Sequence, residues 1–155
     1  MAVADDADAG TAADEAHRVV AANTFMTLAT ADGDGRPWAT PVWFAARDCA
    51  EFVWLSRPGA RHSVNIAGRP RVGIVVHDPG ASAGPAAVYV EADADEVTPA
   101  DRADALAVLN SRARERGLRT YGAPDVTGAA QFRLYRARTR RIYVLDEHDG
   151  RVEVR

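Results

Sequence analysis

The chain of 155 residues contains one cysteine, no lysine and no long apolar run. Because Cys49 has no second cysteine to pair with, the chain cannot form an internal disulfide, which fits a reducing compartment. No apolar stretch approaches the ~20 residues that a membrane-spanning helix needs. The formal net charge of -3 argues against nucleic acid or an anionic membrane surface as a partner. We therefore expect a cytoplasmic protein with neither a nucleic-acid nor a membrane partner.

The familiar signatures of catalysis and metal binding are also missing. No Ser/His/Asp order, paired carboxylates or cluster of metal ligands stands out, so we expect no metal and the catalytic residues stay unassigned. Asp32 and Asp34 resemble the start of a calcium loop, but Trp43 stands where such a loop needs a glutamate. Residues 32–35 are therefore predicted to form a tight hairpin turn. If the protein is an enzyme, we expect a bound cofactor to carry the chemistry.

Hydrophobic periodicity predicts six or seven strands joined by short turns, together with three helices. The expected strands cover 24–31, 36–46, 51–56, 71–77, 86–97, 131–137 and 140–146, the last two as a hairpin, and residues 152–154 extend the sheet. The expected helices begin at Thr11, cover 60–67 and run from Pro99 to about Arg116. Short connections favour an antiparallel sheet, closed into a small barrel and decorated by helices. We expect one domain over residues 12–155, preceded by a disordered tail over 1–11.

The junction between the third strand and the following helix is the most informative segment. The apolar strand ends at Ser56, passes through the turn at Pro58–Gly59 and enters a helix that opens with Arg61 and His62. Backbone N–H groups at a helix N-terminus are unpaired, and the helix dipole places partial positive charge there. Arg61 can bind two phosphate oxygens, and the Ser56 hydroxyl can donate a further hydrogen bond. Because the segment has no nucleophile, we interpret it as a cofactor-phosphate site.

The strand predicted over 36–46 contains two prolines, Pro37 and Pro41. Proline has no N–H to donate to a neighbouring strand, so this strand is an edge, is bulged, or leaves one side open to a ligand. The alternation of side chains places Thr40 and Val42 on one face and the two prolines on the other. The strand therefore joins the helix junction as a candidate part of a binding site.

Four consecutive segments carry a further signal: Arg36–Phe44, Val53–Arg57, Ala60–Ile66 and Pro70–Val72. In order, spacing and residue type they resemble the pyridoxamine 5'-phosphate oxidase-like flavin-binding split-barrel family. The resemblance implies a mainly β fold, namely a six-stranded antiparallel split barrel of the FMN-binding type. It also implies a homodimer in which two subunits form paired flavin sites along their interface.

The resemblance assigns cofactor-binding residues position by position. These are Thr40, Pro41, Val42, Trp43, Leu55, Ser56, Arg57, Arg61 and His62. Residues 40–43 would lie along the isoalloxazine ring, and residues 55–56 would contact the region between ring and phosphate. Arg61 and His62 would grip the phosphate. His62 stands where a family lysine is common, and a neutral imidazole is a weaker ligand for an anion.

The resemblance implies an oxidoreductase that depends on FMN or, alternatively, on a 5-deazaflavin coenzyme, and that acts on a small organic substrate. Vitamin B6 oxidation is not carried over, because the C-terminal substrate motif of true pyridoxamine phosphate oxidase has no counterpart in residues 131–144. A non-catalytic flavin- or haem-binding carrier of the same fold is the alternative. Arg138, Arg140 and Arg141 form a basic strip that is either a solvated face or reaches the cofactor across the dimer interface.

Overall fold

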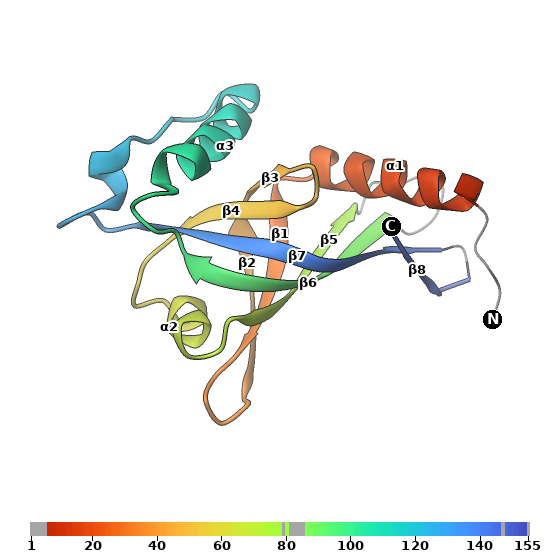
Figure 1. The fold of residues 1–155 in the computed structure, drawn as a ribbon, viewed down its shortest axis with the longest axis horizontal. Helices are drawn as coiled ribbons and strands as arrows, with labels where there is room; N and C mark the ends of the chain where they lie inside the picture. Colours follow the sequence, from red (N-terminus) through yellow and green to blue (C-terminus); the bar gives the residue numbers. More distant parts are fainter. Residues whose placement is uncertain (1–5, 79, 81–85, 147, 155) are drawn as a thin grey trace.

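A computed structural model describes residues 6–78, 80, 86–146 and 148–154 of the chain. Within them, one antiparallel eight-stranded sheet has the order β2-β1-β5-β6-β7-β4-β3, with β8 beside β7. The strands are β1 (Phe25–Ala31), β2 (Pro37–Trp43), β3 (Ala45–Arg47), β4 (Glu51–Ser56), β5 (Arg71–Asp78), β6 (Ala86–Glu96), β7 (Arg133–Leu145) and β8 (Arg151–Glu153). The helices are α1 (Asp6–Ala22), α2 (Arg61–Gly68) and α3 (Arg102–Glu115), with a 3-10 turn, η1 (Ala123–Val126). The sheet curls into a half-barrel with the helices around it (Figure 1), which confirms the predicted antiparallel split-barrel class with eight strands in place of six.

A single residue, Phe44, joins the two ends of the strand order. β2 ends at Trp43 and pairs with β1, whereas β3 begins at Ala45 and pairs with β4. The strand predicted over 36–46 is therefore two strands, which lie at opposite edges of the described sheet. Phe44 is 1% exposed, and its ring lies 5.8 Å from that of Phe52 in the core. This short link requires the sheet to curl, because its outermost strands must come within reach of each other.

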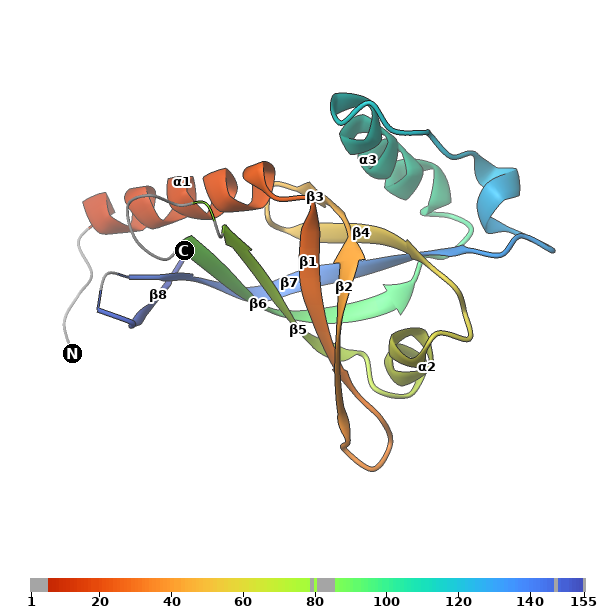
Figure 2. The same cartoon turned by 180° about the vertical axis from the view of Figure 1, so that it is seen from behind.

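The hydrophobic core is formed by apolar side chains of the curled sheet and of the helices that cover it. Leu28 of β1 and Trp54 of β4 belong to one continuous cluster inside the barrel. α1 adds Val19 to the same cluster and lies across the ends of β5 and β6 (Figure 2). A second cluster joins Leu109 of α3 to Val53, on the other face of β4. β4 is thus buried on both faces, which explains its unbroken apolar run.

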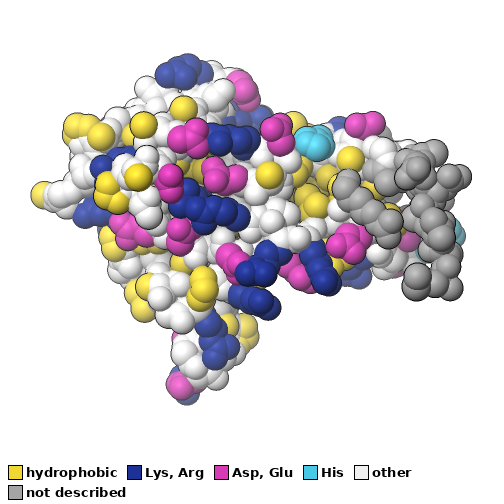
Figure 3. Space-filling view, viewed as in Figure 1, with side chains coloured by type: hydrophobic (Ala, Val, Ile, Leu, Met, Phe, Trp, Pro, Cys, Tyr) yellow, Lys and Arg dark blue, Asp and Glu magenta, His cyan; other side chains and the backbone are white. Residues whose placement is uncertain are grey.

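The final strand differs from the predicted hairpin. β7 is continuous and pairs with both β6 and β4. No turn residue interrupts its arginine-rich middle, and the ladder instead shifts register between Glu91 and Ala92 of β6. Arg138 is paired with Asp95 on β6 at 3.2 Å, so the charged middle of the strand is accommodated by ion pairs between strands. Positive and negative side chains accordingly lie next to each other on the surface (Figure 3).

The starts of two helices also differ from the prediction. α1 begins at Asp6 rather than Thr11, so part of the segment predicted as a disordered tail is helical; residues 1–5 lie outside the described residues. This segment is rich in alanine, which is the strongest helix former. α3 begins at Arg102 rather than Pro99. Of the helices that the structure describes, none has the length and apolar character needed to cross a membrane.

Two smaller predictions are confirmed. The hairpin between β1 and β2 turns tightly: the Gly35 N–H donates to the Asp32 carbonyl at 2.9 Å, and Asp32 Oδ1 accepts from the N–H groups of Asp34 and Arg36. Gly35 has a φ of +83°, a conformation that favours glycine. At the other end of the chain, β8 pairs with β7, so the sheet is extended there as expected for residues 152–154.

Candidate functional site

Ser56 and His62 meet at the junction of β4 and α2. Ser56 is the last residue of β4 and is buried, and its hydroxyl forms a hydrogen bond with Nε2 of His62 in the first turn of α2. Which of the two groups donates depends on the tautomer of the imidazole. The structure therefore brings two of the residues predicted to hold a phosphate into direct contact.

The N-terminus of α2 is open to an acceptor from outside the helix. Ala60 occupies the N-cap position and makes no side-chain capping hydrogen bond in the described structure. The N–H groups of the first turn therefore have no intrahelical partner. Arg61 is exposed beside them, and its guanidinium carbon lies 4.6 Å from the ring centroid of Trp38 on β2. A positive helix end, a guanidinium and a buried hydroxyl are together suited to bind an anion.

Buried polar contacts hold α2 against the β1–β2 hairpin. Asn65 Nδ2 donates to Thr30 Oγ1 at 3.0 Å, and the Thr30 hydroxyl donates to the carbonyl of Trp38 at 3.4 Å. Asn65 and Thr30 are 4% and 5% exposed, and Ile66 packs into the core beside them. Because Trp38 also lies under Arg61, these contacts fix the start of α2 relative to β2.

The protonation state of His62 is set by its surroundings. Burial lowers the pKa of His62 from its ordinary value, so the imidazole is neutral near pH 7 in the free protein. A phosphate placed beside it would favour the protonated form, because an opposite charge stabilises the imidazolium. Binding of a phosphate at this junction would therefore be coupled to proton uptake by His62.

A cavity of about 490 Å³ adjoins the end of β2. Its lining residues are Pro41, Val42, Trp43, Leu55, Ala113, Leu118, Arg119, Tyr121 and Phe132. The first four were predicted as cofactor contacts, and the structure brings them together on one wall. Thr40 is half-buried in β2 and does not line the cavity. The other wall comes from α3 and the loop before β7 and was not predicted from the sequence. The aromatic residues Tyr121 and Phe132, in an otherwise small and polar loop, were the available signal.

The two arginines predicted at the cofactor stack on different aromatic rings. The guanidinium carbon of Arg61 lies over Trp38, whereas that of Arg57 lies 5.9 Å from the ring centroid of Phe132. Phe132 lines the cavity and the exposed Arg57 lies against its ring, although Arg57 is not itself a lining residue. Among the predicted cofactor residues, Ser56, Arg61 and His62 thus lie at the β4–α2 junction, whereas Arg57 lies against Phe132.

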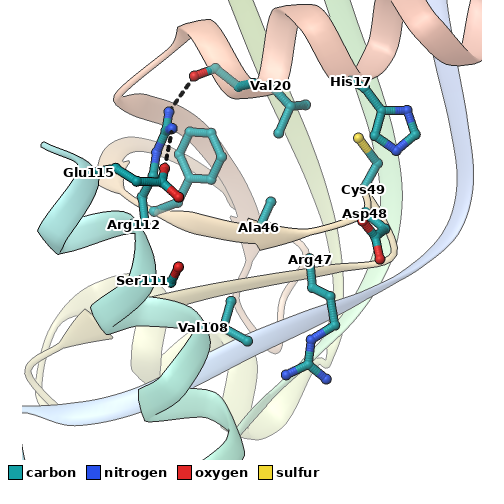
Figure 4. Close-up of a pocket in the computed structure, with 12 residues that line it drawn as sticks. His17, Val20, Ala46, Arg47, Asp48, Cys49, Val108, Ser111, Arg112 and Glu115 are labelled. Carbon is teal, nitrogen blue, oxygen red and sulfur yellow. Dashed lines mark hydrogen bonds and ion pairs between the residues drawn. The ribbon is translucent and has the colours of Figure 1, made fainter.

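A second cavity, of about 380 Å³, lies between α1, α3 and the β3–β4 turn (Figure 4). Cys49 is buried there, and burial raises the pKa of its thiol to about 11. The thiol stays protonated near neutral pH and is a poor nucleophile. His17 also lines this cavity, with Nδ1 bonded to the carbonyl of Ala13 at 2.7 Å. In the part of the chain that the structure describes, no group of three or more His, Cys, Asp or Glu side chains could hold a metal ion.

The basic strip of the final strand is largely paired with acidic residues of β6. Arg140 Nε pairs with Asp93, and Arg138 pairs with Asp95 at 3.2 Å. Both arginine side chains are more than half exposed, as expected of a solvated face. Their alternative role at a cofactor across a dimer interface stays a prediction.

The curled antiparallel sheet, with α2 following directly from the end of β4, defines a split-barrel protein. The model of the pyridoxamine 5'-phosphate oxidase family matches residues 12–146 of the chain. The protein belongs to this family, and the resemblance inferred from its sequence is confirmed. No curated protein matches the sequence.

Solved structures of several bacterial proteins share the fold. A haem binding protein from Mycobacterium smegmatis has a TM-score of 0.70 and 24% identity, over 91% of this chain and 56% of that chain. HutZ, the haem storage protein of Vibrio cholerae, has a TM-score of 0.65 and 21% identity, over 84% of this chain and 92% of HutZ. An FAD-binding protein from Mesorhizobium loti has a TM-score of 0.60 and 26% identity, over 83% and 89%. The chain thus spans little more than half of the Mycobacterium smegmatis protein, and the two haem proteins show a shared fold alone.

Proposed function

We propose that the protein is a flavin-dependent oxidoreductase that binds FMN, or a 5-deazaflavin coenzyme of similar shape, and acts on a small organic substrate. The observation that carries this proposal is the contact between Ser56 and His62 at the uncapped start of α2, beside Arg61. Membership of the pyridoxamine 5'-phosphate oxidase family and the fold shared with an FAD-binding protein support it.

The residues present fit a flavin mononucleotide. Ser56, Arg61 and His62, with the first N–H groups of α2, would hold the phosphate through a hydroxyl, a guanidinium and an imidazole. Residues 40–43 and Leu55 would lie along the ring system, on the wall that the cavity shares with β2 and β4. The phosphate surface is cationic and the ring surface is apolar, which matches the two ends of the cofactor.

When bound, the cofactor supplies the hydride or electron transfer. The chain's own residues bind it, orient it and keep water from one side of the ring. β2 is an edge strand, so backbone polar groups on its open side are available to the polar rim of the ring. His62 takes up a proton as the phosphate binds, which strengthens its hold on the anion.

We propose further that the protein works as a cytoplasmic homodimer with the cofactor sites at the interface. Trp38 on β2 and Val64 on α2 are 39% and 59% exposed, and both belong to the elements that surround the phosphate site. Large apolar side chains exposed near a binding site favour contact with another protein surface. Sedimentation equilibrium of the wild-type protein and of Val64→Glu tests this: the wild type should be a dimer and the variant should dissociate more readily.

An FMN titration tests the leading proposal. Purified protein should quench FMN fluorescence, and Arg61→Ala should bind FMN about 10- to 150-fold more weakly, the equivalent of roughly 1.5–3 kcal/mol for a charge-assisted pair. Arg36→Ala, an exposed arginine at the tip of the β1–β2 hairpin, is the matched control and should bind as the wild type does. The deazaflavin coenzyme requires a parallel titration. A protein that binds neither cofactor contradicts the proposal.

The second candidate function is a non-catalytic carrier of flavin or haem. The fold shared with the haem binding protein of Mycobacterium smegmatis and with HutZ favours it. Two measurements separate the candidates. A carrier should bind flavin, or haem as seen by its Soret absorbance, and the reoxidation of its reduced flavin should not depend on any substrate in a panel. Substrate-dependent reoxidation identifies the oxidoreductase.

A further inference from the structure

One wall of the 490 Å³ cavity is aromatic, and side-chain hydrogen bonds hold part of its backbone in place. The side-chain amide of Asn110 on α3 holds the backbone of Tyr121 at two points: Nδ2 donates to the Tyr121 carbonyl and Oδ1 accepts from the Tyr121 N–H, each at 2.8 Å. Trp43 and Phe132 complete the aromatic part of the lining. The rings of Trp43, Tyr121 and Phe132 are half-buried, and a cavity lined by three aromatic rings is suited to a flat aromatic ligand.

Two arginines lie on these rings, and one of them has no counter-charge. Arg119 lies 4.8 Å from the ring centroid of Tyr121 and pairs with Asp125 at 2.5 Å. Arg57 lies 5.9 Å from the ring centroid of Phe132, and no carboxylate in the described ranges pairs with it. A positive charge without an acidic partner among the described residues therefore lies next to the aromatic wall, on the exposed Arg57 against Phe132.

We propose that this cavity binds a small aromatic carboxylic acid, with its ring against Trp43, Tyr121 and Phe132 and its carboxylate paired with Arg57. A guanidinium binds a carboxylate through two parallel hydrogen bonds, and aromatic walls bind flat rings. A neutral aromatic molecule would leave Arg57 without a counter-charge, so the acid is preferred. Arg57, predicted from the sequence as a cofactor residue, is thereby assigned to the substrate.

The role of the acid as substrate rests on the proposed function, because the cavity shares Pro41, Val42, Trp43 and Leu55 with the proposed ring surface. Its binding does not rest on the cofactor. The acid would stand beside the ring surface while the phosphate group of the cofactor lies at the α2 junction. Arg57 and Arg61 therefore serve two different ligands, and each can be altered separately.

The test uses two probes of nearly equal shape, 2-naphthoate and its neutral amide, titrated by calorimetry into cofactor-free protein at low ionic strength. The wild type should bind naphthoate about five-fold more tightly than the amide, as expected for a partly exposed ion pair. Arg57→Gln should lose this preference, and Tyr121→Ala should weaken both probes. Arg36→Gln removes one positive charge at a remote hairpin and should keep the preference. High salt should reduce the preference of the wild type.

The same variants are titrated with FMN to separate the two sites. Arg61→Gln should weaken FMN and leave naphthoate binding as in the wild type, and Arg57→Gln should do the reverse. The inference is overturned if neither naphthalene binds, if acid and amide bind equally, or if Arg57→Gln keeps full affinity for naphthoate. Naphthoate binding that depends on Arg57, in a protein that binds no flavin or deazaflavin, overturns the proposed function and supports the acid site.

Discussion

A double-mutant cycle on Asn65 and Thr30 tests whether their hydrogen bond holds α2 in place. The two side-chain atoms are 3.0 Å apart, and the residues are 4% and 5% exposed, so neither can turn to water when its partner is removed. Asn65→Leu and Thr30→Val keep the approximate size of each side chain and remove its hydrogen-bonding groups. The two single variants and the double variant are compared with the wild type.

The magnitude follows from the burial of both partners. Thr30→Val leaves the Asn65 amide buried without this partner, which costs about 1–3 kcal/mol. Asn65→Leu removes one of the two hydrogen bonds of the Thr30 hydroxyl, which still donates to the Trp38 carbonyl, so its cost should lie near the lower end of that range. At this chain length, 1 kcal/mol lowers Tm by roughly 2–4 °C, so each single variant should melt roughly 2–12 °C below the wild type. The double variant removes both partners together. Its loss should be smaller than the sum of the single losses by about 1 kcal/mol.

Urea denaturation followed by circular dichroism measures the free energy of unfolding of the four proteins. Thr27→Val, at an exposed threonine on the same strand, is the matched control and should stay within about 0.5 kcal/mol of the wild type. FMN titration of Asn65→Leu should also show weaker binding, because Arg61 and His62 depend on the position of α2. Losses that add to within about 0.5 kcal/mol would refute the reasoning, since uncoupled residues behave in that way.

Other properties of the structure lead to three further expected outcomes. Burial lowers the pKa of His62 from 6.5, so the folded protein binds fewer protons than the unfolded chain, and the free energy of unfolding should fall as pH drops below 6.5. His62→Asn should make that fall shallower in urea titrations across this range. An identical pH profile of the variant and the wild type would contradict the assignment. The pKa of the Cys49 thiol is about 11, so Ellman's reagent should react with the native protein far more slowly than with the urea-unfolded chain, and equal rates would contradict its burial. Arg112 donates to the carbonyls of Ala21 at 2.5 Å and Asn23 at 2.8 Å. Arg112→Leu should therefore lower the free energy of unfolding by about 1–3 kcal/mol and speed hydrogen exchange at the end of α1. Unchanged exchange there would show that this cap is dispensable.

The β4–α2 junction could be predicted because its chemistry is local in the sequence. Ser56, Arg61 and His62 stand in one short segment, and the turn between them directs the chain from strand into helix. Helix N-termini offer unpaired N–H groups whatever the rest of the fold. The contact between Ser56 and His62 therefore follows from neighbouring residues alone, and their role with a cofactor stays a prediction.

The continuous course of β7 could not be predicted from local pattern. Arg138 and Arg140 interrupt the apolar alternation and suggest a break between two strands. Their partners, Asp95 and Asp93, belong to β6 and stand far earlier in the sequence. Periodicity detects apolar faces, and it gives no information about ion pairs formed between strands. The break between β2 and β3 at Phe44 could not be predicted from local pattern either, because no glycine or proline stands at that position.

The aromatic wall of the cavity was missed for a related reason. The sequence predicts the helix that carries Asn110, and it does not predict the path of the loop that follows. That path is fixed by two hydrogen bonds from Asn110 to the backbone of Tyr121. Side chains that hold a loop in this way leave no periodic signal, so the position of Arg57 on Phe132 also emerged from the structure alone.

The link at Phe44 also bears on how the barrel closes. Bringing two distant parts of a chain together carries an entropic penalty that grows with the length of the intervening loop. Here one residue separates the two edge strands, so the penalty is close to its minimum. To move β2 and β3 apart, the chain would have to withdraw the Phe44 ring, which is 1% exposed, from the core. Curvature and core packing are therefore one cooperative unit, and the barrel keeps its shape without any covalent cross-link.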